Sequence, residues 1–287
     1  MVSAKEVVVT VVIVKILVFV VGLCLGSFLN VVIYRLPREG VSVTQPARSE
    51  CPSCQAPIAW YDNLPLISYA ILMGRCRHCR TSISIRYPLV ELISGLLTLA
   101  VFMKSGASVR FLADLYLVLA LVAITYIDLD EMIIPDAITL PGIVIGLAAA
   151  IITPSPQLIG PWLGGHLMAW GVESYRWLGV IGSILGMIIG GGTVWIIFQA
   201  YFLWRKEEGI GGGDFTLLAM IGACLGWRAV FITIFFGSLA ALATAVIMAV
   251  RAGEFHPQMK LPFGPFLSLA ALVYLFFGEQ ILRWYLG

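Results

Sequence analysis

Two acidic clusters stand at the edges of apolar segments, where a carboxylate is costly and therefore marks a candidate functional site. The first cluster begins with Asp128, at the end of one apolar run. The second is a glycine run, Gly211, Gly212 and Gly213, that leads into Asp214 and another apolar run. Two carboxylates at one depth can share a proton, so that one acts as general base on a water while the other binds the scissile carbonyl. The two clusters therefore predict an aspartic peptidase site.

Asp128 is the better candidate within the first cluster, because it directly ends the apolar run and so loses the most hydration. Asp130 and Glu131 are expected to be solvated, and Asp136 follows a proline at the start of the next run, where helix capping is the structural alternative. We predict Asp128 and Asp214 as the catalytic pair, with the three glycines giving a substrate backbone close access. Taken singly, each cluster also fits a solvated loop or a capped turn.

Four cysteines form a second candidate site. Cys51 and Cys54 make one C-x2-C pair, and Cys76 and Cys79 repeat it after 21 intervening residues. Two such pairs present four thiolates to one point, which satisfies a tetrahedral Zn²⁺ as a closed structural site. A rubredoxin-like iron site or two disulfides use the same ligands, and a reducing compartment disfavours the disulfides. We predict a structural zinc site with no open position for a substrate.

The elements that position both sites are apolar helices. Hydrophobic residues make up 60% of the 287 residues and charged residues 12%, with a mean hydropathy of +0.97. A soluble domain carries about 25% charged residues, so this chain is an integral membrane protein, which excludes a nucleic-acid binder and a secreted disulfide scaffold. The apolar runs are of helix length and lack the alternation of barrel strands. The helices are predicted at 7–34, 88–104, 111–128, 137–153, 177–203, 214–226, 229–250 and 262–282.

The predicted fold is therefore all-α: a polytopic membrane protein of about eight transmembrane helices with a small metal-binding cytoplasmic loop domain. We predict three parts, namely residues 1–34 as the first span, 35–87 as the four-cysteine domain and 88–287 as a membrane-embedded aspartic peptidase domain. Basic residues mark the cytoplasmic side, and seven of the eighteen fall within 35–87. Alternating from there places the cysteine loop and both acidic clusters on the cytoplasmic side. The run 214–226 is short and contains glycines, so we expect it to be a tilted or partly re-entrant segment buried among the others.

The chain resembles the bifunctional type IV prepilin peptidases, which are leader peptidases and N-methyltransferases of the GxGD aspartic class. The family's catalytic aspartates fall on Asp128 and Asp214. Its members often carry a lysine two residues after the second aspartate, where this chain has Thr216. The segments that carry the resemblance are the four cysteines, Gly26-Ser-Phe-Leu-Asn30 through Tyr34-Arg35-Leu-Pro37, Arg86-Tyr-Pro-Leu-Val-Glu91, Ile127-Asp128-Leu-Asp130, Gly211-Gly-Gly-Asp214 and Pro262-Phe-Gly-Pro265.

The resemblance implies cleavage of a short basic leader from type IV prepilins or pseudopilins at the cytoplasmic face of the bacterial inner membrane. It also implies methylation of the new N-terminal amine with S-adenosylmethionine as donor, and it associates the 35–87 domain with that step. No glycine-rich nucleotide loop after a strand is visible, so we assign no residue to S-adenosylmethionine. The expected partners are these substrates and membrane lipid, with no nucleic acid.

Two other classes of function fit parts of the sequence. An ion-coupled transporter could use Glu91 and Asp114, which lie within other apolar runs. Transporter folds usually show two related halves, and no repeat is visible between the spans before and after residue 150. A non-enzymatic assembly scaffold with a zinc-ordered loop is the other alternative, and it predicts that Asp128→Asn and Asp214→Asn leave function intact.

Overall fold

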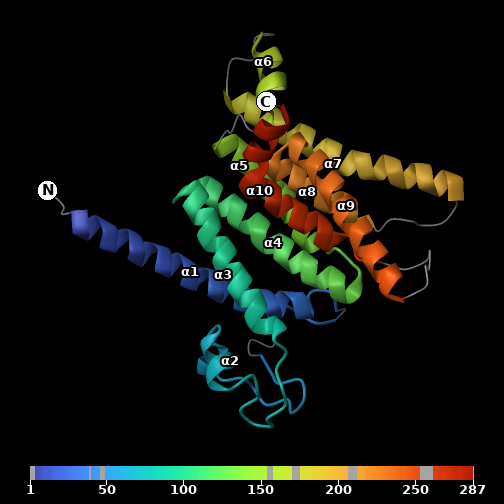
Figure 1. The fold of residues 1–287 in the computed structure, drawn as a ribbon. Coiled ribbons are helices and arrows are strands. Elements are labelled where there is room, and N and C mark those ends of the chain that lie inside the picture. Colours follow the sequence, from blue (N-terminus) through green and yellow to red (C-terminus); the bar gives the residue numbers. More distant parts are fainter. Residues whose placement is uncertain are drawn as a thin grey trace. The chain divides into compact units, whose positions relative to one another are not determined.

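The architecture is given by a computed structural model, shown in Figure 1, which describes residues 4–38, 40–45, 49–153, 158–169, 175–205, 212–252 and 261–286. In these ranges the chain is almost entirely helical, with two isolated β-bridges and no sheet, which confirms the predicted fold class. The elements are α1 (Ala4–Arg35), η1 (Trp60–Asn63), α2 (Ile67–Ile71), α3 (Arg86–Ser105), α4 (Val109–Glu131), α5 (Asp136–Ile152), α6 (Pro161–Ala169), α7 (Tyr175–Arg205), α8 (Gly212–Leu225), α9 (Trp227–Ala252) and α10 (Gly264–Leu286).

All eight apolar segments predicted from the sequence are helices. Six of the described helices are long and apolar enough to cross a membrane, namely α1, α3, α4, α7, α9 and α10. The other two, α5 and α8, are apolar but have only 17 and 14 residues. The multi-pass membrane fold is thus confirmed, while the count of eight crossings stays a prediction. The short elements η1, α2 and α6 were not predicted, because they lie outside the long apolar runs.

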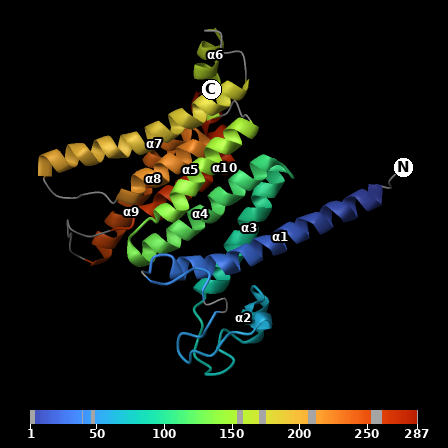
Figure 2. The same cartoon turned by 180° about the vertical axis from the view of Figure 1, so that it is seen from behind.

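The chain divides into two compact units, residues 1–111 and 112–287. In the first unit α1 packs along α3, and both views of the ribbon show the two helices crossing (Figures 1 and 2). A Cβ at Gly26 would lie 2.7 Å from the Cα of Glu91, and one at Gly22 would lie 2.7 Å from the Cβ of Thr98. Small residues therefore let the two backbones approach, as is usual between membrane helices. The cysteine segment, between α1 and α3, carries only η1 and α2.

In the second unit α8 is the central helix, and α5, α7, α9 and α10 pack against it. Every residue of α8 from Thr216 to Leu225 is buried, which confirms that this short helix lies among the others. Its contact with α7 is backbone to backbone, since a Cβ at Gly186 would lie 2.2 Å from the carbonyl oxygen of Gly222. This contact holds the second half of α8 close against α7.

A tight turn joins α4 to α5 and fixes the position of the first acidic cluster. The backbone N–H of Met132 donates to the Asp128 carbonyl at 3.0 Å, and Met132 has a φ of +53°, which ends α4. Pro135 then precedes the first residue of α5, Asp136, where a fixed φ suits the start of a helix. Asp128 and Asp136 thus lie at the two ends of one short turn.

Candidate functional site

Asp128 lies in the last turn of α4, and only 5% of its surface is exposed. Its Oδ2 accepts a hydrogen bond of 2.8 Å from the backbone N–H of Gly264. Gly264 is the first residue of α10. The carboxylate therefore lies at a helix N-terminus, where unpaired N–H groups and the helix dipole favour a negative charge.

Position 264 has no room for a larger side chain. A Cβ there would lie 2.8 Å from Asp128 Oδ2 and 3.2 Å from its Cγ. The following residue, Pro265, has no N–H, so Gly264 is the donor that this end of α10 offers. We did not predict this contact, although Gly264 belongs to one of the segments that carry the family resemblance.

Asp214 lies in the first turn of α8 and is also buried, with 9% of its surface exposed. Asp128 and Asp214 interact electrostatically, so the fold brings the two carboxylates into each other's range from separate helices. The free N–H groups at the start of α8 favour an anion here as well. The two aspartates singled out from the sequence thus belong to one buried acidic group.

The glycines before Asp214 meet the turn between α4 and α5. A Cβ at Gly213 would lie 2.5 Å from the Cβ of Ile134 and 2.9 Å from its carbonyl oxygen, so glycine allows these segments to touch. Gly212 is exposed, and Gly211 lies outside the described residues. The predicted role of the three glycines in substrate access stays a prediction.

A hydroxyl network joins α5 to α8 next to these carboxylates. The Thr216 hydroxyl donates to Asp136 Oδ1 at 3.1 Å, and the Thr139 hydroxyl donates to Thr216 Oγ1 at 3.1 Å. Both threonines are buried. At the position where the resembling peptidases often carry a lysine, this chain therefore uses a neutral donor to contact Asp136. We did not predict this network from the sequence.

The two carboxylates considered for a transporter lie in different units. Glu91 in α3 accepts a hydrogen bond of 2.9 Å from the backbone N–H of Leu66, which ties the cysteine segment to α3. Asp114 is buried in α4, fourteen residues before Asp128, which corresponds to about 21 Å along a helix. Asp114 is therefore separate from the acidic group of Asp128 and Asp214.

The four cysteines come together in the segment between α1 and α3. They are free thiols whose sulfur atoms all lie within 4.8 Å of one another, and Cys51 Sγ is 3.8 Å from Cys79 Sγ. Four sulfurs held about 2.3 Å from a zinc ion at tetrahedral angles are about 3.8 Å apart. The cluster can therefore hold a metal ion.

The two cysteine pairs adopt the same local fold. The backbone N–H of Gln55 donates to the Cys51 carbonyl at 2.8 Å, and that of Arg80 donates to the Cys76 carbonyl at 3.1 Å. Gln55 and Arg80 both have a positive φ, 56° and 61°, which turns the chain back after each pair. One isolated β-bridge flanks each pair. The repeat in the sequence thus forms two equivalent knuckles that face one point.

The protein environment gives three of the cysteine thiols different acidities. Backbone N–H groups, with that of Cys54 foremost, lower the pKa of Cys51, and the Thr81 hydroxyl and N–H lower the pKa of Cys79 to about 6. The Ala56 N–H lowers the pKa of Cys54, but desolvation and the neighbouring sulfurs outweigh it and raise this pKa to about 11. Two of the sulfurs therefore favour the thiolate, which is the form that binds a metal.

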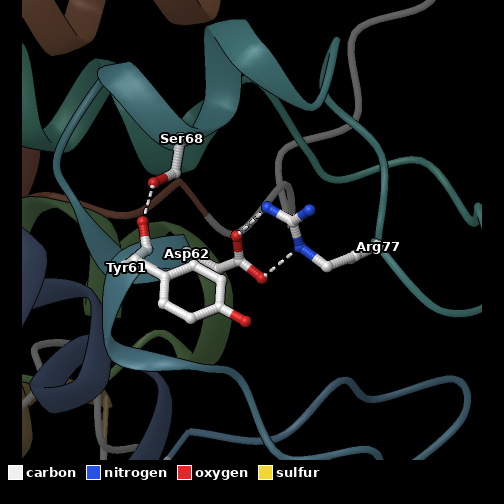
Figure 3. Close-up of polar contacts among 4 residues, drawn as sticks. All are labelled: Tyr61, Asp62, Ser68 and Arg77. Carbon is white, nitrogen blue, oxygen red and sulfur yellow. Dashed lines mark hydrogen bonds and ion pairs between the residues drawn. The ribbon is translucent and has the colours of Figure 1, made fainter.

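An ion pair joins Arg77, in the second knuckle, to Asp62 in η1 (Figure 3). Arg77 Nε donates to Asp62 Oδ2 at 2.7 Å, and its terminal nitrogen donates to the other carboxylate oxygen. These hydrogen bonds hold the pKa of Asp62 below its usual value and raise the pKa of Arg77. The Ser68 hydroxyl donates to the Tyr61 carbonyl at 2.7 Å and so joins α2 to η1.

Known proteins match both halves of the chain. The family model described as the bacterial peptidase A24 N-terminal domain matches residues 20–105, and that of the type IV leader peptidase family matches residues 115–246. Relatives named prepilin leader peptidase/N-methyltransferase include one from Aeromonas hydrophila, 38% identical over 94% of this chain and 93% of the relative. Others are from Pseudomonas putida, 36% identical with coverage of 91% and 90%, and Burkholderia pseudomallei, 38% identical with coverage of 90% and 84%. No solved structure matches the chain significantly.

Proposed function

This chain belongs to the type IV leader peptidase family, and on that premise we propose that Asp128 and Asp214 are the carboxylates that cleave its substrate. The enzyme removes the short leader of type IV prepilins or pseudopilins and methylates the new N-terminus. The observation that supports the assignment of the pair is that α4 and α8 bring two buried carboxylates within electrostatic range of each other. Family membership does not favour the transporter and scaffold alternatives.

The arrangement suits water-assisted cleavage of a peptide bond. One carboxylate takes a proton from a water whose oxygen attacks the scissile carbonyl carbon, and the other donates its proton to the carbonyl oxygen. As the tetrahedral intermediate collapses, the carbon–nitrogen bond breaks and the leaving amine takes up a proton. The N–H of Gly264 holds Asp128 Oδ2, so Oδ1 is left for the water or the carbonyl.

The second activity consumes the amine that the first one releases. S-adenosylmethionine carries a methyl group on a sulfonium sulfur. The bond from the unprotonated amine nitrogen to this carbon would form as the carbon–sulfur bond breaks, which releases S-adenosylhomocysteine, and the methylated amine would then lose a proton. We assign residues 35–87 to this methyltransferase function and residues 88–287 to the peptidase, with 1–34 as the first span.

Within the cysteine segment, a structural Zn²⁺ held by Cys51, Cys54, Cys76 and Cys79 is the metal that best fits. The spacing of the sulfurs and the paired knuckles support it. A segment of about fifty residues with few apolar side chains needs such a cross-link to be ordered. The enzyme is a multi-pass protein of the bacterial inner membrane, and the basic 35–87 segment supports a cytoplasmic position for the cysteines and for both aspartates.

The test is a two-step assay with purified enzyme in lipid vesicles, a prepilin substrate and S-adenosylmethionine. Mass spectrometry of the product is expected to show loss of the leader and then addition of one methyl group. Intact substrate after full incubation would overturn the proposed function. A product that is cleaved but never methylated would overturn the methyltransferase half alone.

A further inference from the structure

The cysteine segment exposes an apolar surface on an otherwise polar domain. Between Trp60 and Met73 five large apolar side chains are exposed, and we call them the 60–73 surface. Ile67 and Ile71 lie one turn apart on the same face of α2. The exposed fractions are 80% for Trp60, 43% for Leu64, 57% for Ile67, 69% for Ile71 and 85% for Met73. Exposed apolar surfaces of this kind mark a site of interaction.

A hydrogen bond to α3 holds this surface at the level of the membrane interface. The backbone N–H of Leu66, directly before α2, donates to Glu91 Oε2 at 2.9 Å. Glu91 lies five residues beyond Arg86, the first residue of the membrane-crossing helix α3, which corresponds to about 7.5 Å along the helix axis. Amphipathic elements that lie in a bilayer surface bury their apolar face about 5–10 Å into the boundary between headgroups and acyl chains. The depths agree.

The surface is also held rigidly in place. The Ser68 hydroxyl donates to the Tyr61 carbonyl (Figure 3). The Tyr61 ring lies edge-on to the Trp60 ring, with 5.7 Å between the ring centroids. Leu66 has a φ of +59°, a conformation that is strained for a residue other than glycine. The bond to Glu91 is thus kept at a cost in backbone strain. The exposed apolar side chains are therefore preorganised for their partner.

The charges around the surface select that partner. The sequence from residue 36 to 85 contains five arginines and three acidic residues. Arg77 is paired with Asp62, whereas Arg75 and Arg80 are exposed and form no ion pair in the described part of the chain. Basic residues near an anionic membrane are attracted to its surface. We propose that the 60–73 surface inserts into the headgroup region of an anionic lipid leaflet, with Arg75 and Arg80 at the lipid phosphates.

The apolar segment of a prepilin is the other occupant that such a surface could take. The leader next to that segment is basic, so Arg75 and Arg80 would repel it. Trp60 points to lipid as well, because exposed tryptophan is enriched where membranes meet water. Lipid therefore satisfies both the apolar and the basic part of the surface.

The test is photo-crosslinking of the full-length enzyme in vesicles. The photoreactive residue p-benzoylphenylalanine is placed at Ile71 or, as the matched control, at Glu50, which is exposed on the first knuckle of the same segment. The vesicles are pure phosphatidylcholine or equal parts of phosphatidylcholine and phosphatidylglycerol. Mass spectrometry then measures lipid adducts on each variant, with and without a prepilin peptide.

We expect position 71 to form on the order of tenfold more lipid adduct than position 50, as burial of one isoleucine side chain in the interface implies. Phosphatidylglycerol should raise the yield at position 71, and Arg75→Gln combined with Arg80→Gln should abolish this increase. Equal yields at positions 71 and 50 would overturn the proposal. An adduct at position 71 that forms only with the prepilin peptide would overturn it in favour of a substrate surface.

Discussion

The substitution Gly264→Ala is expected to slow leader cleavage without unfolding the helical bundle. The new Cβ would lie 2.8 Å from Asp128 Oδ2 and 3.3 Å from Ile134 Cδ1. Asp128 is buried, so its carboxylate must shift by a few tenths of an ångström to relieve the overlap. The shift lengthens the 2.8 Å hydrogen bond from the Gly264 N–H and so disturbs the position of the carboxylate.

The size of the effect follows from this one bond. A hydrogen bond to a charged group contributes about 1.5–3 kcal/mol. Each loss of about 1.4 kcal/mol of transition-state stabilisation lowers a rate tenfold. If the bond is weakened by half or lost, kcat/KM for leader cleavage falls by about 3- to 150-fold.

Gly237→Ala is the matched control, because its Cβ would lie 3.1 Å from Leu267 Cδ2 in the contact between α9 and α10. It adds similar crowding without touching either aspartate. The assay is kcat/KM for leader cleavage, together with the thermal unfolding midpoint of each variant. A normal rate for Gly264→Ala, or an equal loss of rate in both variants, would refute the role of the Gly264 N–H in orienting Asp128.

Three further predictions concern the cysteine segment and the hydroxyl network. Cys54→Ser is expected to lower the zinc content of the purified enzyme and to let trypsin cut at Arg75 and Arg80, while Cys24→Ser, which lies outside the cluster, keeps both properties of the wild type; full zinc content in Cys54→Ser would contradict the site. Thr216→Val removes one hydrogen bond to Asp136, which is exposed and keeps a longer one of 3.5 Å from Thr139, and should lower the free energy of unfolding by about 0.5–1.5 kcal/mol; denaturant titration measures this, and failure of Thr216→Ser to restore the wild-type value would count against the hydrogen bond. Asp62→Asn should raise the rate of proteolysis of the cysteine segment only modestly, since Arg77 is half exposed and its ion pair is screened by water. Because the pKa of Asp62 lies below 3.8, the contribution of this ion pair is present at higher pH and lost only as the pH falls through the lowered pKa, so proteolysis rates should differ by a constant factor from about pH 8 to about pH 5. A difference that shrinks within that range would show that another group carries the effect.

The helices and the cysteine knuckles could be predicted because their signals are local. Each apolar run is long enough to specify a membrane helix by itself, so even the buried position of α8 followed from its length and glycines. The four cysteines repeat one spacing, and each knuckle closes through hydrogen bonds within five residues. The elements η1, α2 and α6 have four, five and nine residues, too few for a hydrophobic period to show.

The contacts that shape the acidic group could not be predicted, because they join distant parts of the chain. The bond from Gly264 to Asp128 spans 136 residues, and that from Thr216 to Asp136 spans 80. The role of a glycine run is also ambiguous in the sequence. Gly213 packs against Ile134 in the turn between α4 and α5. The sequence does not distinguish this packing role from a role in substrate access. Such pairings depend on how α4, α5, α8 and α10 pack, which no single segment encodes.

The most direct test of the catalytic pair is the rate of leader cleavage by Asp128→Asn and Asp214→Asn, measured beside Asp136→Asn as the control from the same turn. Asparagine keeps the shape of each side chain but can neither take up a proton nor share one. The pair predicts that both Asp128→Asn and Asp214→Asn abolish cleavage, while Asp136→Asn retains most of it. Cleavage at the wild-type rate by either Asp128→Asn or Asp214→Asn would contradict the assignment.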